Sequence, residues 1–244
     1  MPIPLASRQR LPELMDQPGL DPAEHERALA GLRRINAISR CSASLLAPIR
    51  ELARRQPAQP LRLLDLACGG GDTAIDLALA ARRLGLELIV EGCDLNPEAV
   101  TIARANASRR GAAVRFFCAD ALADPWPEGG AAASPEGYDV MLTSLFLHHL
   151  DNADAERLLA LMARRAGRLV LVNDLIRSPL GFALAWAGTR LLSRSPVVHT
   201  DGPLSVRAAF RLAEVSAMAA RAGLAGFELR RCWPERYLLR WSRA

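Results

Sequence analysis

The sequence predicts an α/β fold: a doubly wound sheet of seven mostly parallel strands, in which the last strand is antiparallel. From residue 61 onward, short apolar runs alternate with helical patterns. Three glycines, at 69–71, stand between the first apolar run and the helical pattern that follows it. Near the end, two apolar segments are joined so tightly that they must be antiparallel, because a parallel crossover needs a dozen or more residues.

The length and composition bound the class of protein. A chain of 244 residues can form one large α/β domain with a substantial core. Half of the residues are hydrophobic, but every stretch of 18 residues is interrupted by a charged residue. No membrane span is therefore expected. Residues 1–10 contain no apolar signal-peptide core, and the five cysteines show no paired spacing. We therefore expect a cytoplasmic protein with reduced cysteines.

The basic residues do not favour a nucleic-acid partner. The net charge is +5, but all 31 basic residues are arginines. They are scattered in pairs, such as Arg33-Arg34 and Arg82-Arg83, where helices would face solvent or end. This pattern, beside abundant alanine, indicates a compositional bias of the genome rather than a basic groove.

The alternating part of the chain predicts five strands and three connecting helices. Each apolar run is short and continuous, which is typical of parallel strands covered on both faces. Asn96 and Pro97 supply the N-cap and the first residue of the second helix. The strands are expected at 62–66, 87–93, 113–118, 138–143 and 168–173, and the helices at about 73–84, 97–110 and 153–165.

Two segments are expected to cover the sheet. The helical periodicity of residues 23–54 predicts an N-terminal helical lid within residues 1–60, ahead of a main domain at 61–244. Segment 174–204 is too apolar and aromatic for a loop, and it predicts a helical insertion after the fifth strand, over the carboxyl edge of the sheet. Segment 124–137 has the composition of a loop.

The C-terminal part departs from simple alternation. The sequence Asp201-Gly202-Pro203 is expected to form a turn, and Ser205 to be the N-cap of a long helix at about 205–222. Strands at 226–232 and 236–242 then form the closing antiparallel hairpin.

The glycine turn at 69–71 predicts a nucleotide-type cofactor site. Glycines let the backbone turn sharply and approach a ligand closely, because no Cβ intervenes. The helix that follows presents unpaired N–H groups and a positive dipole end beside that ligand.

The segment from Asp65 to Gly71 (DLACGGG) resembles the signature of the class I S-adenosylmethionine-dependent methyltransferases, in the branch that acts on quinones, polyketides and phenols. Ala67 replaces the first glycine of the family's D/E-x-G-x-G-x-G pattern and keeps that position small. The resemblance covers residues 25–243 and includes a Rossmann-like sheet with a reversed last strand. It implies S-adenosylmethionine as cofactor and methyl transfer to a hydroxyl of a hydrophobic aromatic or polyketide-like molecule.

The same resemblance implies roles for the cofactor-binding residues. Asp65 would help to hold the amino group of the cofactor, often through water. Asp94 would accept hydrogen bonds from the two ribose hydroxyls, Leu95 would pack on the adenine, and Asp120 would lie near the adenine amino group. The implied cofactor set also includes Ala67, Cys68, Gly69, Gly71, Ala121 and Ser144.

Other functions compete with this interpretation. Residues 69–74 also match the G-x-G-x-x-A fingerprint of nicotinamide dinucleotide enzymes, but Asp65, Asp120 and the reversed hairpin favour the methyl donor. C-methylation of a similar ring, a methyltransferase for RNA or protein, and a domain without catalytic activity remain alternatives. The stretch 143–150 lacks the Asn/Asp-Pro-Pro-Tyr motif common in enzymes that methylate base amino groups.

Histidines are the candidates for a catalytic base. Methyl transfer needs an aligned hydroxyl whose proton is removed or shared, and an imidazole has a suitable pKa. We expect His148 or His199 in this role. The histidines show no ligand spacing, so no metal is expected. The acceptor pocket is expected to include Phe146, His149, Phe182 and Trp186, although such aromatic residues more often belong to an ordinary core. A monomer or homodimer is expected.

Overall fold

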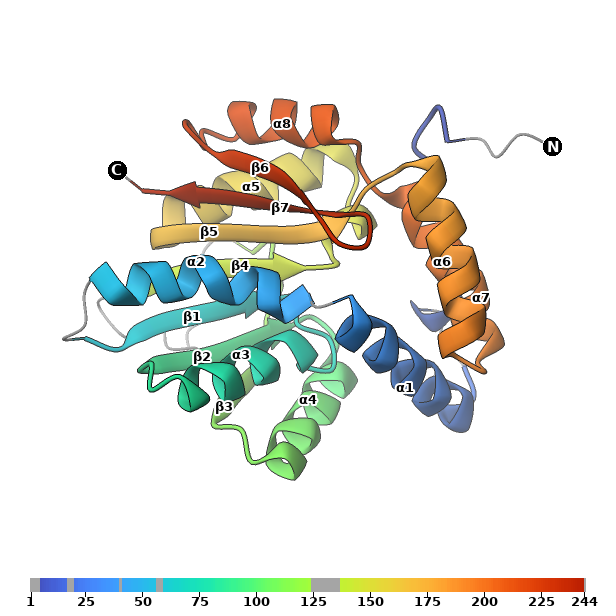
Figure 1. The fold of residues 1–244 in the computed structure, drawn as a ribbon, viewed down its shortest axis with the longest axis horizontal. Coiled ribbons are helices and arrows are strands. Elements are labelled where there is room, and N and C mark those ends of the chain that lie inside the picture. The colour runs from blue at the N-terminus through green and yellow to red at the C-terminus, as the bar shows by residue number, and fades with distance from the viewer. Residues whose placement is uncertain (1–4, 17–19, 40, 56–58, 124–136, 244) are drawn as a thin grey trace.

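The structure, a computed structural model, describes residues 5–16, 20–39, 41–55, 59–123 and 137–243. It confirms the predicted doubly wound sheet (Figure 1). The seven strands are β1 (Leu61–Leu66), β2 (Leu88–Asp94), β3 (Val114–Cys118), β4 (Tyr138–Ser144), β5 (Ala166–Leu175), β6 (Glu228–Cys232) and β7 (Arg236–Ser242). Their order is β3-β2-β1-β4-β5-β7-β6, and β7 is antiparallel to both of its neighbours.

Helices cover both faces of this sheet. One layer consists of α2 (Cys41–Arg55), α3 (Asp72–Arg83) and α4 (Pro97–Arg110), and the other of α5 (Asn152–Arg165) and α8 (Leu212–Arg221). Alternate strand residues face opposite layers, because successive side chains of a strand point to opposite sides. Leu63 packs in the core of the first layer and its neighbour Leu64 in the core of the second, and both are fully buried. This explains the continuous apolar runs of the sequence.

The strand order places the ligand-binding edge of the sheet. From β1 the chain runs outward to β2 and β3 on one side, and then to β4 and β5 on the other. In open α/β sheets, ligands bind outside the carboxyl ends of the strands where the order reverses. Leu66, Asp94 and Ser144 end the strands β1, β2 and β4 at this point.

Three helices lie beyond the carboxyl edge of the sheet, at the right of Figure 1: α1 (Pro22–Ile38), α6 (Pro179–Leu192) and α7 (Pro196–Ala208). Each of them contacts the other two. The helical insertion predicted within 174–204 is therefore present, although β5 extends to Leu175 and α7 extends beyond 204. The helical region predicted at 23–54 consists of two helices, α1 and α2.

The predicted turn at Asp201-Gly202-Pro203 and the helix at 205–222 are wrong. Residues 201–205 lie inside α7, where the Ser205 hydroxyl donates to the Asp201 carbonyl (2.9 Å) instead of capping a helix. Helix α7 ends at Ala208, and the segment that follows β5 forms hydrogen bonds with the next two residues. The Arg177 guanidinium donates to the Ala209 carbonyl (2.6 Å), and the Arg177 N–H donates to the Phe210 carbonyl (3.1 Å). The separate helix α8 follows.

Two further predictions concern the loop at 124–137 and membrane spans. Residues 124–136 of the expected loop lie outside the described residues. Within the described part of the chain, no helix combines the length and apolar character needed to cross a membrane.

Helix α2 belongs to the core of the sheet, unlike α1. Leu45 and Ile49 of α2 are buried and share a cluster with strand residues such as Leu63.

We predict that Ile49→Ala lowers the free energy of unfolding by about 2–5 kcal/mol, because a cavity forms in a close-packed layer. Leu84→Ala, at a side chain that is 47% exposed, is the control and should cost less than about 1 kcal/mol. Equal losses in urea unfolding would contradict this position of α2.

Candidate functional site

The glycine turn joins the end of β1 to the start of α3 in a left-handed backbone conformation. Ala67, Gly69 and Gly71 have φ angles of 53°, 51° and 79°. The Cys68 N–H donates to the Cys93 carbonyl (2.9 Å), so the turn is tied to β2, and the Gly71 N–H donates back to the Cys68 carbonyl (2.9 Å). Ala67 has a left-handed conformation that is unfavourable for a residue with a Cβ but not for glycine, so the backbone is strained at this position.

Close packing explains why Gly71 has no side chain. A Cβ on Gly71 would lie 2.6 Å from Phe116 Cζ and 3.0 Å from Ala103 Cβ. A Cβ on Gly69 would meet no atom within 4 Å, so the space beside that residue is open. The turn is therefore packed on its inner side and open on its outer side, as a backbone that approaches a ligand must be.

Asp65 is a buried carboxyl group beneath this turn. Its side chain is 1% exposed and accepts a hydrogen bond from the Ala74 backbone N–H. Its Oδ2 atom has no hydrogen-bond partner among the described residues. Burial, followed by repulsion from Asp94, raises the pKa of Asp65 to about 8. A buried acceptor without a partner is costly and fits a ligand that supplies a donor or a positive charge.

Asp94 connects the ends of two strands. Its Oδ2 accepts the Gly69 N–H (2.8 Å), and its Oδ1 accepts the Asn96 N–H (2.9 Å) at the start of α4. The carboxylate is thus held in one orientation at the open side of the turn, and each oxygen keeps a further lone pair for a ligand. The neighbouring Leu95 side chain is 70% exposed, an apolar surface beside a polar one.

The remaining cofactor candidates lie at the same sheet edge. Asp120 is exposed after β3, and its Oδ1 accepts the Leu122 N–H (2.8 Å). Ala121 beside it is buried. Ser144 ends β4, and the next residue, Leu145, has a φ of 56° and donates its N–H to the Asn173 carbonyl (2.8 Å). The topology therefore brings the predicted cofactor residues to the ends of four adjacent strands.

A second polar cluster lies at the ends of β4 and β5. His148 is 3% exposed, in the short helix η3 (Leu147–His149). Its Nδ1 lies 2.7 Å from Asp174 Oδ1, and its backbone N–H donates to Asp174 Oδ2 (3.1 Å). Burial opposes protonation of this imidazole, but the Asp174 carboxylate outweighs burial and raises the pKa of His148.

The N-terminal segment completes this cluster. Arg8 donates to the carbonyl oxygens of His148 (2.8 Å) and Leu150 (2.6 Å), and Glu13 Oε1 lies 3.9 Å from His148 Nε2. The rings of His148 and His149 are 4.2 Å apart between centroids. Burial, followed by repulsion from His148, lowers the pKa of His149 to about 3.

Sequence reasoning missed Arg8, Glu13 and Asp174. Asp174 follows a predicted strand, and its position at a carboxyl strand end was a usable signal. Arg8 and Glu13 precede the first predicted helix in a segment without periodicity, so only the folded chain brings them to the site.

The other predicted acceptor residues are dispersed. His199 lies on α7, where its Nε2 is 2.9 Å from the Ser193 carbonyl. Phe146 stacks on His149, with centroids 6.3 Å apart. Phe182 is half-buried on α6, and Trp186 on the same helix is 51% exposed, with the Arg190 guanidinium 4.3 Å from its ring. The catalytic role of His199 and the acceptor roles of Phe146, His149, Phe182 and Trp186 stay predictions.

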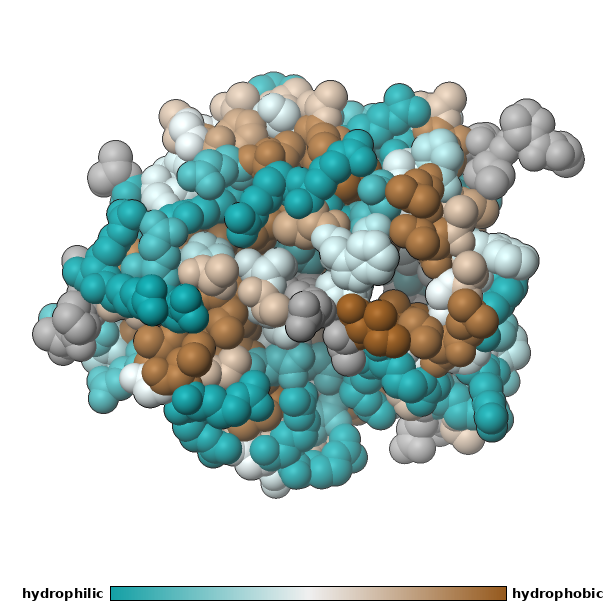
Figure 2. Space-filling view, in the orientation of Figure 1, coloured by the Kyte–Doolittle hydropathy of each residue, from teal (hydrophilic) through white to brown (hydrophobic). Residues whose placement is uncertain are grey.

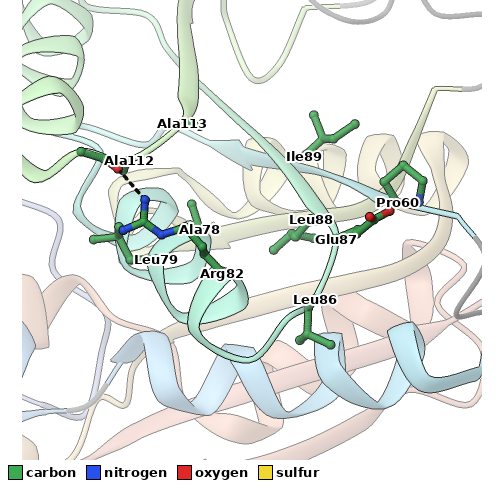
Figure 3. A pocket seen from close by; sticks show the side chains of 11 residues that line it. Pro60, Ala78, Leu79, Arg82, Leu86, Glu87, Leu88, Ile89, Ala112 and Ala113 are labelled. Atoms are coloured by element: carbon green, nitrogen blue, oxygen red, sulfur yellow. Dashed lines mark hydrogen bonds between the residues drawn. The ribbon is translucent and has the colours of Figure 1, made fainter.

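A cavity of about 380 Å³ lies at the opposite edge of the sheet (Figure 3). It is lined by residues from the start of β2 and the end of α3, including Leu88, Leu79 and Ala78. Among the described residues that line it, only Arg82 and Glu87 are charged, and Arg82 donates to the Gly111 carbonyl (3.2 Å). It is therefore separate from the acids at the carboxyl edge.

Comparisons with known sequences agree with this geometry. Residues 63–166 match a family model described as a methyltransferase domain. A ubiquinone biosynthesis O-methyltransferase of Cereibacter sphaeroides is 32% identical over 147 residues, 59% of this chain and 53% of that protein. A demethylmenaquinone methyltransferase of Thermus thermophilus is 50% identical over 70 residues, 29% of this chain and 30% of that protein. The chain thus spans about half the length of the first relative.

Solved structures share the fold. A magnesium protoporphyrin IX methyltransferase from Synechocystis PCC 6803 with bound SAH has a TM-score of 0.56 at 18% identity, covering 94% of this chain and 91% of that one. The plantazolicin methyltransferase BpumL, in complex with SAH and a pentazolic analog, has a TM-score of 0.61 at 14% identity, covering 90% of this chain and 96% of that one.

The packing of Gly71 generates a prediction with a matched control. Gly71→Ala should cost about 1–2 kcal/mol for the left-handed backbone and a further 1–3 kcal/mol or so for the contact with Phe116. Gly85→Ala is the control. Gly85 has a similar φ of 65°, but an added Cβ would meet no atom within 4 Å, so this substitution should show the backbone cost alone. Chemical denaturation measures both. Equal losses would show that packing around Gly71 contributes nothing.

Proposed function

We propose that this chain, which belongs to the class I S-adenosylmethionine-dependent methyltransferases, transfers a methyl group from S-adenosylmethionine to a hydroxyl of a hydrophobic small molecule. One observation carries the proposal. The buried Asp65 carboxyl has an oxygen without a hydrogen-bond partner among the described residues, and it lies under a glycine turn that Asp94 binds where the strand order reverses.

The charges at the turn fit this cofactor. When bound, S-adenosylmethionine supplies a methyl group on a positively charged sulfur. The carboxyl groups of Asp65 and Asp94 favour a ligand with cationic groups and hydroxyl donors, and ionisation of Asp65 is easier beside a cation. A pyrophosphate at the same turn would be repelled by the Asp94 carboxylate and would oppose ionisation of Asp65, which argues against the nicotinamide dinucleotide alternative. The exposed Leu95 side chain offers an apolar surface for the adenine.

The cofactor residues would act through position and hydrogen bonding. Asp94 would hold the ribose hydroxyls with oxygen lone pairs left over from its two backbone bonds. The backbone of Ala67, Cys68, Gly69 and Gly71 would follow the methionine and ribose part. Ser144 would line the methionine side, and Asp120 and Ala121 would lie at the adenine. Holding both reactants in line supplies most of what this displacement needs.

His148 is better placed than His199 to take the proton of an acceptor hydroxyl. A carboxylate oxygen only accepts, so His148 Nδ1 carries the proton that Asp174 binds, and Nε2 keeps its lone pair. Asp174 also favours the protonated ring that would form. His199 Nε2 is committed as a donor to the Ser193 carbonyl, although its Nδ1 remains a possible acceptor of a proton.

The acceptor is proposed to be an aromatic, quinone-like or polyketide-like molecule. Figure 2 shows hydrophobic side chains along α6 and at the neighbouring end of α1, on the side where the strands end. Leu180, Trp186 and Leu191 of α6 and Ile38 of α1 are at least half exposed. Apolar side chains at a cofactor site suit a hydrophobic ring better than a charged polymer. Phe146, His149 and Phe182 are proposed to line the same pocket.

Carbon is the alternative to oxygen as the methylated atom. The Cereibacter relative is named an O-methyltransferase, which favours a hydroxyl, but a C-methyltransferase acting on a similar ring would use the same cofactor residues. We propose a monomer or homodimer with no nucleic-acid partner.

Ligand binding tests the cofactor. S-adenosylmethionine and S-adenosylhomocysteine should raise the melting temperature of the full chain, whereas NAD should not, because only a ligand of the folded state stabilises it. Asp94→Asn should weaken S-adenosylhomocysteine binding by about 10–100-fold, the value of one or two hydrogen bonds to a charged group. Asp76→Asn, at an acid that pairs with Arg110 on the surface, is the control. No response to either sulfur compound would refute the proposal.

Turnover tests the acceptor and the base. A panel of phenols, quinols and polyketide products, followed by mass spectrometry, should reveal products that gain one CH₂. With such an acceptor, His148→Gln and Asp174→Asn should lower kcat by about 10²–10⁴-fold, because the proton acceptor is lost or misoriented. Binding of S-adenosylhomocysteine should be unchanged. Full activity in both variants would exclude His148 as the base, and loss in His199→Ala alone would transfer the role.

A further inference from the structure

We infer that Glu13, His148 and His149 form a binding site for one divalent transition-metal ion, for which Zn²⁺ is the best match. Each residue offers one ligand atom, and the three atoms all lie within 4.8 Å of one another. Two imidazoles and one carboxylate are a ligand set of catalytic zinc sites, which leave the fourth position to water.

The hydrogen bonds of His148 are those of a metal ligand. Asp174 Oδ1 binds Nδ1 (2.7 Å), and Asp174 Oδ2 binds the backbone N–H of the same residue (3.1 Å). The ring is therefore held in one orientation and one tautomer, with Nε2 directed toward Glu13 Oε1 at 3.9 Å. A carboxylate on the far nitrogen is the usual partner of a histidine that binds zinc, because it orients the ring and makes the near nitrogen a better ligand.

Glu13 is also held in place. Its Oε1 accepts the Ser205 hydroxyl (2.5 Å) from α7. The next two residues, Leu14 and Met15, donate their N–H groups to the Asp201 carboxylate at 2.8 and 3.0 Å. Two residues of α7, Ser205 and Asp201, therefore hold Glu13 and the residues that follow it, and no long side chain must be ordered when an ion binds.

Charges of both signs surround the cluster: the Arg8 and Arg10 guanidinium groups donate to the carbonyl oxygens of His148 and His149, whereas carboxylates face the imidazole side. The carboxylates of Glu13 and Asp174 supply two negative charges within contact of the His148 ring. The ligand atoms are wider apart than in a loaded site, so the Glu13 side chain of the N-terminal segment and the His149 ring would move toward His148 when an ion binds. Such an ion would link this segment to the body of the fold at the carboxyl edge of the sheet.

Metal binding and the proposed base use the same nitrogen. An ion on Nε2 removes the lone pair that would accept the proton of the hydroxyl. If the proposed function is correct, Zn²⁺ occupancy should therefore inhibit methyl transfer. This consequence rests on the proposed function, whereas the site itself does not.

Binding to the full chain, stripped with a chelator, tests the site. Equilibrium dialysis should show one equivalent of Zn²⁺, and Co²⁺ in its place should give the visible absorption of a site with nitrogen and oxygen ligands. Glu13→Gln and His149→Ala should both lose this equivalent. Glu156→Gln, an acid paired with Arg221 on the surface, should keep it. Circular dichroism verifies that each variant is folded.

Three results would overturn the inference. They are the absence of stoichiometric uptake, uptake that both ligand variants retain, and a near-ultraviolet thiolate-to-cobalt band, which would assign the ion to one of the free cysteines such as Cys118. A metal-free ion pair between His148 and its two carboxylates would give the first result. The response to S-adenosylhomocysteine, measured on the same samples, separates failure of this site from failure of the proposed function.

Discussion

The hydrogen bond from the Gly69 N–H to Asp94 Oδ2 is the interaction on which the cofactor side of the structure depends. It joins the turn after β1 to the end of β2, and the second oxygen of the same carboxylate binds the start of α4. Two adjacent strand ends and one helix start are thereby held together by a single side chain. The left-handed turn exposes the backbone where a ligand can lie, and Asp65 beneath it supplies a buried carboxyl group.

A second carboxylate has the same function on the acceptor side. Asp174 at the end of β5 binds both the ring and the backbone of His148 after β4, so the two strand ends are again joined by one acid. The N-terminal segment then covers this pair through Arg8 and Glu13. The two carboxylates, Asp94 and Asp174, lie on opposite sides of the point where the strand order reverses. In the proposed function, these two carboxylates mark the cofactor side and the acceptor side along one edge of the sheet.

Backbone strain among the described residues is concentrated at this edge. Among the described residues other than glycine, only Ala67 and Leu145 have a positive φ, and they follow β1 and β4 directly. Such conformations cost about 1–3 kcal/mol each and persist only where the surrounding structure holds them. The Asp65 oxygen without a partner lies beside the first of them. The stability of the two core layers therefore supports a site that is locally unfavourable until a ligand binds.

The sequence by itself determined the sheet, its glycine turn and the acids at the carboxyl ends of β1, β2 and β3. These features are local: buried strands are continuous apolar runs, and a helix that begins at a glycine turn has its own sequence signature. The break between α7 and α8 coincides with a contact that is not local, because Arg177, in the segment after β5, donates to the Ala209 carbonyl. Only the tertiary structure decided that Glu13 and Asp174 flank His148, since these residues come from segments far apart in the chain. Contacts of that kind depend on how the elements pack, and no periodicity or motif encodes them.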